Sequence, residues 1–213
     1  MKLKYPNVYF INGTAYAGKS TMVKLLSDKY DGILCEENYQ DQYLASLDKN
    51  EFPALCYTRD LEDFREFIRR TPDEYEAWIK AVTKECTIIE FRILDELSKQ
   101  NKKIFVDTNI PVSILKEISD ENHVVIMLAD KNISVNRFFD RPDKEKQFLY
   151  QLLLQEEDPD KALANFRECL NRINSEESYN EFLNSGFKVI LRDESRTKEE
   201  TLALVEKVFQ LDK

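Results

Sequence analysis

The chain has 213 residues, of which 42% are hydrophobic and 33% charged, as in an ordinary globular protein rather than a disordered or fibrous one. Its formal net charge of −9 would repel a nucleic-acid backbone or an anionic membrane, so we expect neither as a partner. The length suits one α/β domain covering residues 1–213, and no apolar run approaches the roughly 20 residues that span a bilayer.

Five short apolar runs rich in β-branched and aromatic residues predict strands that are buried on both faces. They lie at 7–12, 32–35, 103–107, 123–128 and 187–191. Stretches with helical spacing alternate with them, at 19–29, 72–100, 111–119, 133–139, 160–184 and 198–210. The alternation predicts right-handed βαβ crossovers and a parallel sheet covered by helices, with binding sites at the carboxyl ends of the strands.

Two helix boundaries and one long connection stand out. The sequence TPDE at 71–74 has a capping Thr71 followed by a proline and two acids, which predicts a helix start, and Gly186 closes a helix before the last strand. The connection 37–102 is far longer than a crossover requires. We expect it to carry the site for a second substrate.

The cysteines and the N-terminus indicate the compartment. Cys35, Cys56, Cys86 and Cys169 are scattered without a CxxC pair, and the first residues run directly into a strand without a signal-peptide pattern. We therefore expect reduced thiols and a cytoplasmic protein. His123 is the only histidine, so we expect no zinc site.

The sequence GTAYAGKS at 13–20 satisfies the phosphate-loop pattern G-x-x-x-x-G-K-[ST], with an apolar strand before it and a helix after it. Glycines let successive N–H groups point at a phosphate, and the helix start adds its dipole. Lys19 is expected to reach the β- and γ-phosphates and Ser20 to ligate Mg²⁺. The residues predicted to bind the nucleotide here are Gly13, Thr14, Ala15, Tyr16, Ala17, Gly18, Lys19, Ser20 and Thr21.

Two residues of this segment leave alternatives open. Thr21 either touches the α-phosphate or serves the start of the helix. Tyr16 places a ring where a small residue would be easier to accommodate. It either packs outward on the loop, which we favour, or lines the acceptor pocket.

These residues resemble those of the P-loop small-molecule kinases, the group containing shikimate kinase, gluconate kinase, chloramphenicol phosphotransferase, and nucleoside and nucleoside-monophosphate kinases. GTAYAGKST resembles their Walker A loop, ILCEEN (33–38) their acidic second-strand end, IFVDTN (104–109) their third strand, and NRFFDRPDKEK (136–146) their arginine-bearing lid. The resemblance implies a P-loop NTPase three-layer sandwich with a five-stranded parallel sheet in the order 2-3-1-4-5. It also implies a helical, acceptor-binding insertion at 37–102 and a lid at 137–150.

The lid resemblance implies that Arg137 and Arg141 neutralise charge on the transferred phosphoryl group. A solvated surface with ion pairs from Arg141 to Asp140 or Asp143 is the alternative.

The resemblance also implies acids near the phosphates. Glu36, ranked first, and Glu37 lie where related kinases accept or orient a hydroxyl proton, although each could simply be an acid at a helix start. Asp107 occupies the position of the Walker B acid that orients Mg²⁺. Thr108 follows it in place of a second acid, which argues against a hydrolysis-driven machine.

The loop LRDESRTKEE at 191–200 lies where these relatives hold adenine. Arg192 is expected to stack on the base, with Asp193 and Ser195 capping the final helix. The guanine-reading N-K-x-D order is absent, so ATP is preferred over GTP.

The long connection combines aromatic rings with arginines, which could sandwich a ring and hold an acceptor carboxylate or phosphate. The rings are Tyr39, Tyr43, Phe52, Tyr57, Phe64, Phe67, Tyr75 and Trp78, and the arginines are Arg59, Arg65, Arg69 and Arg70. Leu61, Phe64, Phe67 and Ile68 have helical spacing and favour packing instead.

The sequence therefore predicts an ATP- and Mg²⁺-dependent phosphotransferase acting on a small molecule, most simply a hydroxyl, as a monomer or homodimer. The alternatives are a nucleoside or nucleoside-monophosphate kinase and a non-catalytic nucleotide-binding switch.

Overall fold

The computed structural model describes residues 3–130, 133–140 and 144–211. It divides into two compact units. The first, called here the sheet unit, comprises Met1–Gln42, Cys86–Ala129 and Asn180–Lys213. The second, the helical unit, comprises Tyr43–Glu85 and Asp130–Tyr179. The stretch 37–102, predicted as one insertion, is thus shared between the units, whereas the segment 137–150 belongs to the helical unit.

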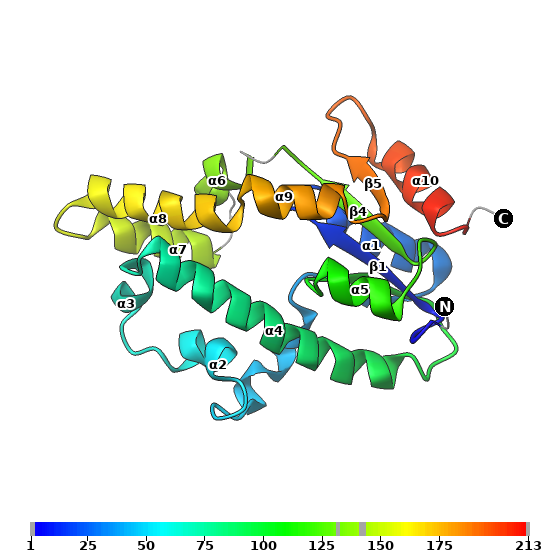
Figure 1. Cartoon of the computed structure of the whole chain (residues 1–213), viewed down its shortest axis with the longest axis horizontal. Coiled ribbons are helices and arrows are strands. Elements are labelled where there is room, and N and C mark those ends of the chain that lie inside the picture. Colours follow the sequence, from blue (N-terminus) through cyan, green and yellow to red (C-terminus); the bar gives the residue numbers. More distant parts are fainter. Residues whose placement is uncertain (1–2, 131–132, 141–143, 212–213) are drawn as a thin grey trace. The chain divides into compact units, whose positions relative to one another are not determined.

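Five parallel strands form one sheet in the sheet unit (Figure 1). They are β1 Val8–Gly13, β2 Ile33–Cys35, β3 Ile104–Asp107, β4 Val124–Leu128 and β5 Lys188–Leu191. Their order is β2-β3-β1-β4-β5, and every neighbouring pair is parallel. The predicted α/β class, the predicted strands and the strand order are confirmed.

The middle strands are buried on both faces, which explains their nearly continuous apolar sequences. Phe10 and Ile11 of β1 are fully buried, as are the apolar residues of β3 and most of β4. The partner of Ile11 across the sheet is Asp107, and that of Gly13 is Met127. The carboxyl ends of β3, β1 and β4 therefore meet at one edge of the sheet.

Helices lie on both faces of this sheet (Figure 1). α1 (Lys19–Tyr30) contacts β1, β2 and β3 and packs against α10 (Lys198–Val208), while α5 (Val112–Ile118) lies on the opposite face. The N-cap of α10 is Thr197, which exchanges hydrogen bonds with Glu200 in a capping box. The expectation that Asp193 and Ser195 cap this helix was wrong, because Asp193 instead accepts both bonds of Ser195.

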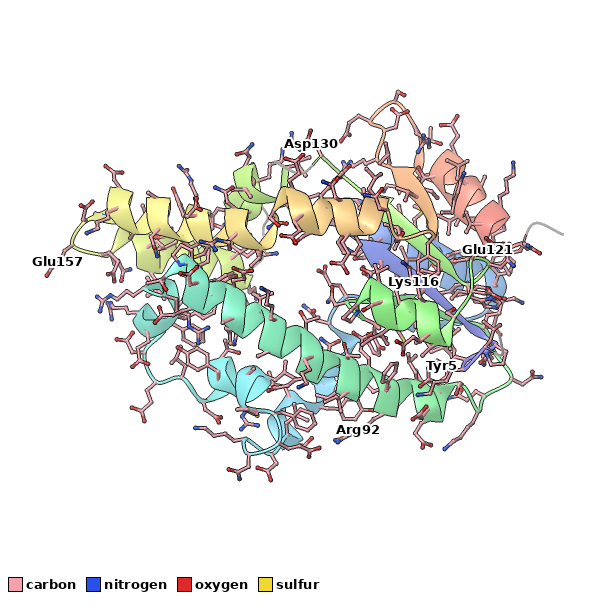
Figure 2. The ribbon with its side chains drawn as sticks, in the orientation of Figure 1. Tyr5, Arg92, Lys116, Glu121, Asp130 and Glu157 are labelled. Atoms are coloured by element: carbon pink, nitrogen blue, oxygen red, sulfur yellow. The ribbon has the colours of Figure 1, made fainter. Side chains whose placement is uncertain are left out.

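The helical unit contains helical segments of several lengths. They are the second half of η1 (Tyr39–Ser46), α2 (Pro53–Asp60), α3 (Arg65–Ile68), the first part of α4 (Pro72–Leu97), α6 (Ile133–Asn136), η2 (Phe138–Asp140), α7 (Lys144–Leu154), α8 (Pro159–Ile173) and the first half of α9 (Glu176–Leu183). Glu157 lies in the turn that joins α7 to α8 (Figure 2). The predicted start of α4 is confirmed, since Thr71 and Glu74 cap each other.

An aromatic cluster forms the core of the helical unit. Phe67, Ile68, Tyr75 and Phe166 are buried in it, and Leu61, Phe64 and Trp78 pack against it. The packing role of the 61–68 apolar residues is therefore confirmed.

The stretch 160–184, predicted as one helix, is interrupted after Ile173. The Asn174 side chain donates to the carbonyl of Leu170, and the Ser175 hydroxyl accepts from the N–H of Ser178. These two polar residues end α8 and begin α9. In the described residues, no helix combines the length and apolarity needed to cross a bilayer.

Candidate functional site

The segment 13–20, which matches the phosphate-loop pattern and is called the phosphate loop below for that match alone, begins where β1 ends, at Gly13. A Cβ atom there would lie 1.9 Å from the carbonyl oxygen of Met127, and the residue has φ 130°, so only glycine fits. The N–H of Thr14 donates to Met127, and its hydroxyl accepts from the N–H of Ala129, at 3.1 and 2.8 Å. The start of the loop is thus fixed to the end of β4.

The loop ends at Gly18, the N-cap of α1. Gly18 adopts φ 93°, and α1 has no side-chain cap in the described chain. Asp158 caps α8 and Thr197 caps α10, whereas α2 and α5 resemble α1 in having no side-chain cap. The first-turn N–H groups of α1 and its positive dipole end therefore suit an external anion.

The middle of the loop turns sharply at Tyr16, which has φ 64° although it is not a glycine. Its carbonyl accepts a hydrogen bond from the guanidinium of Arg192. Thr14, Ala15 and Tyr16 are half-buried, and Ala17 is buried. Arg192, predicted from a distant part of the sequence, thus contacts the phosphate loop directly.

Lys19, Ser20 and Asp107 converge at the start of α1. The ammonium of Lys19, a residue only 6% exposed, lies 3.7 Å from Asp107 and donates to the carbonyl of Thr14 at 3.2 Å. The Ser20 hydroxyl donates to the other Asp107 oxygen at 2.8 Å. A buried cation beside two oxygen ligands suits a phosphate together with a hard divalent cation.

Asp107 is itself buried at the end of β3, with 2% exposure. Burial raises the pKa of its carboxyl, the nearby Lys19 and Ser20 oppose this, and the charge of Glu37 adds to the rise. Burial of a carboxylate is costly unless it is paired, and the Lys19 ammonium supplies the pairing. The Ser20 hydroxyl and the Asp107 carboxylate fit Mg²⁺ by the chemistry of their oxygen atoms.

Glu36 and Glu37 follow β2, before η1, and both are exposed. The charge of Glu37 contributes to the raised pKa of Asp107. The sequence ranked Glu36 first, whereas this effect on Asp107 leads us to prefer Glu37.

A cavity of about 280 Å³ adjoins the loop. Its lining includes Gly18 and Thr21 at the start of α1, and Arg192 and Thr197 from the segment that precedes α10. A larger cavity of about 760 Å³ runs along β5 and Gly186, but no residue of 13–20 lines it. The smaller cavity is the one that could hold the base of a nucleotide whose phosphates lie in the loop.

The two predicted lid arginines differ in what the structure describes. Arg137 is an exposed residue of the helical unit, between α6 and η2. Arg141 lies outside the described residues.

A residue that the sequence analysis missed lies behind Asp107. Glu90 of α4 is 1% exposed and accepts hydrogen bonds from the hydroxyls of Tyr39, at 3.1 Å, and Thr108, at 2.7 Å. Burial raises its pKa to about 7, although these two bonds and the N–H of Asn109 oppose the rise. The pKa of Cys35 is raised to about 12, mainly by burial and to a smaller extent by the charge of Glu90.

Hydrogen bonds connect Glu90 to the phosphate loop. Thr108, which donates to Glu90, accepts from the N–H of Ile110 at 3.0 Å. The carbonyl of Ile110 accepts from the side chain of Asn12 at 2.7 Å, and Asn12 accepts from the N–H of Gly13 at 2.6 Å. A continuous chain of hydrogen bonds, buried except for its last, partly buried bond, thus runs from α4 to the first residue of the loop.

The spacing of α4 contained a signal for this residue. Cys86, Ile89, Ile93 and Leu94 form the buried stripe of this part of the helix, and Glu90 falls within the same stripe. A charged residue at a core position requires buried partners.

A scan against protein-family models matched none of them, and a search of curated proteins returned no match. The functional assignment therefore rests on the loop, the residues around Lys19 and the adjoining cavity.

Proposed function

We propose that the protein is a P-loop phosphotransferase that moves the γ-phosphoryl group of ATP to a small-molecule acceptor. One observation carries the proposal. Lys19, Ser20 and Asp107 meet at an N-terminus of α1 that is bounded by glycine and lacks a side-chain cap. Such an arrangement is suited to bind a phosphate chain and its counter-cation.

In this proposal, the loop N–H groups and Lys19 bind the β- and γ-phosphates of ATP. Ser20 and Asp107 would hold Mg²⁺, which, when bound, neutralises charge on the phosphates. Fixing Lys19 by Thr14 and Asp107 reduces the reorganisation needed when charge develops during transfer.

Glu37 is the leading candidate to orient the acceptor hydroxyl and take its proton. Its exposed carboxylate lies within electrostatic range of Asp107. Glu36 remains the second candidate, since it occupies the neighbouring position after β2.

The adenine is assigned to the cavity of about 280 Å³, near the lower end of ligand-pocket volumes. Arg192 lines this cavity and also holds the carbonyl of Tyr16, so it would link base binding to the shape of the loop.

The aromatic rings of the connection give less support to a nucleoside acceptor than their number suggests. Phe52, Phe67 and Tyr75 are buried, and the indole N–H of Trp78 donates to the carbonyl of Ala54. Rings committed to a core are poorly placed to sandwich a base, so a non-nucleoside acceptor bearing a hydroxyl is preferred.

An acceptor screen tests this function. ADP release would be measured with Mg²⁺ and ATP in the presence of sugar acids, shikimate, nucleosides and nucleoside monophosphates, each with the wild type and Lys19→Ala. We expect one class to raise ADP release well above the acceptor-free rate in the wild type alone. If ATP binds but no acceptor accelerates turnover, a nucleotide-binding switch replaces the kinase.

A further inference from the structure

The four arginines of the connection differ in how their charges are compensated. Arg59 makes two hydrogen bonds to Asp60, and Arg69 makes two to Glu156. Arg65 pairs with Asp63 at 3.6 Å. For Arg70, no side-chain hydrogen bond or ion pair to another described residue is present.

The Arg70 guanidinium is instead held among aromatic rings of the helical unit. Its Cζ lies 4.0 Å from the ring centre of Tyr57, 5.1 Å from Trp78 and 5.6 Å from Phe67. Stacking on aromatic rings orients a guanidinium and removes part of its hydration, while leaving its charge uncompensated.

One nitrogen of this guanidinium is a buried donor without a partner. Nη1 of Arg70 has no hydrogen-bond partner among the described residues. Most buried donors in proteins are paired, so an unpaired one calls for an explanation. The backbone of Arg70 is fixed, because its carbonyl accepts from Asn165 at 2.8 Å and from the Cys169 thiol.

The acidic composition of the chain makes an unpaired arginine unexpected. The chain carries 40 acidic residues against 31 lysines and arginines, so an arginine without a carboxylate partner is unexpected. The nearby Glu74 feels the charge of Arg70, but its carboxylate is bound to the N–H and hydroxyl of Thr71. The neighbouring carboxylate is therefore already engaged.

We propose that Arg70, backed by Tyr57 and Trp78, is an oxyanion-binding site of the helical unit that takes the carboxylate or phosphate group of a small molecule. A planar guanidinium donates two parallel hydrogen bonds to either group, and both would compensate its charge. These residues belong to the helical unit, whereas residues 13–20 belong to the sheet unit, and the test of the anion site does not depend on phosphoryl transfer.

Trp78 provides a direct readout because it is the only tryptophan of the chain and its ring contacts Arg70. Its fluorescence would be titrated with inorganic phosphate and, separately, with succinate, at ionic strength held constant with sodium chloride. We expect a saturable change with half-saturation on the order of 1 mM for at least one of them. The tighter of the two identifies the preferred group.

Three variants locate the response. Arg70→Gln should weaken binding at least about tenfold, because the charged donor is lost. Arg69→Gln is the matched control, since its guanidinium is already paired with Glu156, and its response should stay within about twofold of the wild type. Lys19→Ala should leave the response in place, which excludes binding at the phosphate loop.

Folding of each variant would be checked by circular dichroism, and anion-dependent stabilisation against heat would be measured as a second readout. If Arg70→Gln does not fold, Arg70→Lys retains the charge without the planar fork and should bind more weakly. No saturable response in the wild type, an equal response to chloride, or a response retained in Arg70→Gln would each overturn the proposal.

Discussion

The N-termini of α1 and α8 show two uses of the same structural element. At α8, the carboxylate of Asp158 accepts from the N–H of Lys161 at 3.1 Å, and Pro159 removes a further donor. At α1, Gly18 offers no side chain, and Lys19 and Ser20 follow it at the carboxyl end of the sheet. The N-terminus of α8 is completed by its own residues, whereas that of α1 is open to a ligand.

The largest effect should come from Lys19→Ala, which removes the buried ammonium from the open helix start. We expect phosphoryl transfer to fall by about 1000-fold or more, because that charge would act on the transferred group. ADP release under saturating acceptor measures it. Lys24→Ala, at an exposed position on the same helix, should retain wild-type turnover, and equal loss in both variants would contradict the role of Lys19.

Gly13→Ala should disrupt the close packing of the end of β1 against β4, which holds the start of the loop in place. A Cβ atom would overlap the Met127 carbonyl, so the two strand ends must separate, at a cost of about 3 kcal/mol or more in the free energy of unfolding. Chemical denaturation measures the loss. Gly186→Ala also has positive φ but meets nothing within 4 Å, so its cost should be near 1 kcal/mol. Equal costs would argue against the predicted overlap.

Glu90→Gln tests the buried chain behind the loop through the pH dependence of stability. The pKa of Glu90 is raised from 4.5 to about 7 in the folded protein, so folding takes up a proton between these values. The contribution of Glu90 to the free energy of unfolding of the wild type is greatest below pH 4.5. It declines, by on the order of 3 kcal/mol, as the pH rises through 7. Glu90→Gln should lack this decline.

The measurement is the free energy of unfolding of both proteins between pH 4.5 and 8. Stability of the variant should rise relative to the wild type across this range. Parallel curves would mean that Glu90 is already ionised in the folded protein.

Glu37→Gln should lower turnover by about 10- to 100-fold with little change in ATP affinity, because an amide orients a hydroxyl but does not accept its proton. Glu36→Gln is the comparison at the adjacent position. Steady-state kinetics with varied ATP separate kcat from KM. A larger effect at Glu36 would restore the order ranked from the sequence.

The smallest effect is expected at the closed helix. Asp158→Ala should cost about 1 kcal/mol of stability through loss of the cap on α8, while turnover stays at the wild-type level. Thermal unfolding and ADP release measure the two effects. A turnover loss comparable to that of Lys19→Ala would remove the distinction between the two helix ends.

The sheet and the glycine-bounded turn at residues 13–18 could be predicted because their signals are local. Residues 8–13 and 104–107 are apolar runs of strand length, and the glycines at 13 and 18 carry positive φ, which few other residues adopt. Asp107 could be placed at the carboxyl edge of the sheet because it is the last residue of the predicted strand 103–107.

Other features depended on contacts that no local pattern specifies. The helical spacing of α4 places Glu90 on the buried stripe, but its partners Tyr39 and Thr108 come from other parts of the chain and could not be identified from the sequence. The four arginines of the connection look equivalent in the sequence, and only the carboxylates folded beside three of them distinguish Arg70. The helix break at Asn174 depended on side-chain bonds that compete with the helix.

Binding of a non-hydrolysable ATP analogue in the presence of Mg²⁺, followed by calorimetry, tests the open helix end most directly. We expect one analogue to bind per chain, with affinity about 100-fold lower in Lys19→Ala and unchanged in Lys24→Ala. Absence of binding to the wild type, or equal affinity in Lys19→Ala, would contradict a nucleotide site at residues 13–20.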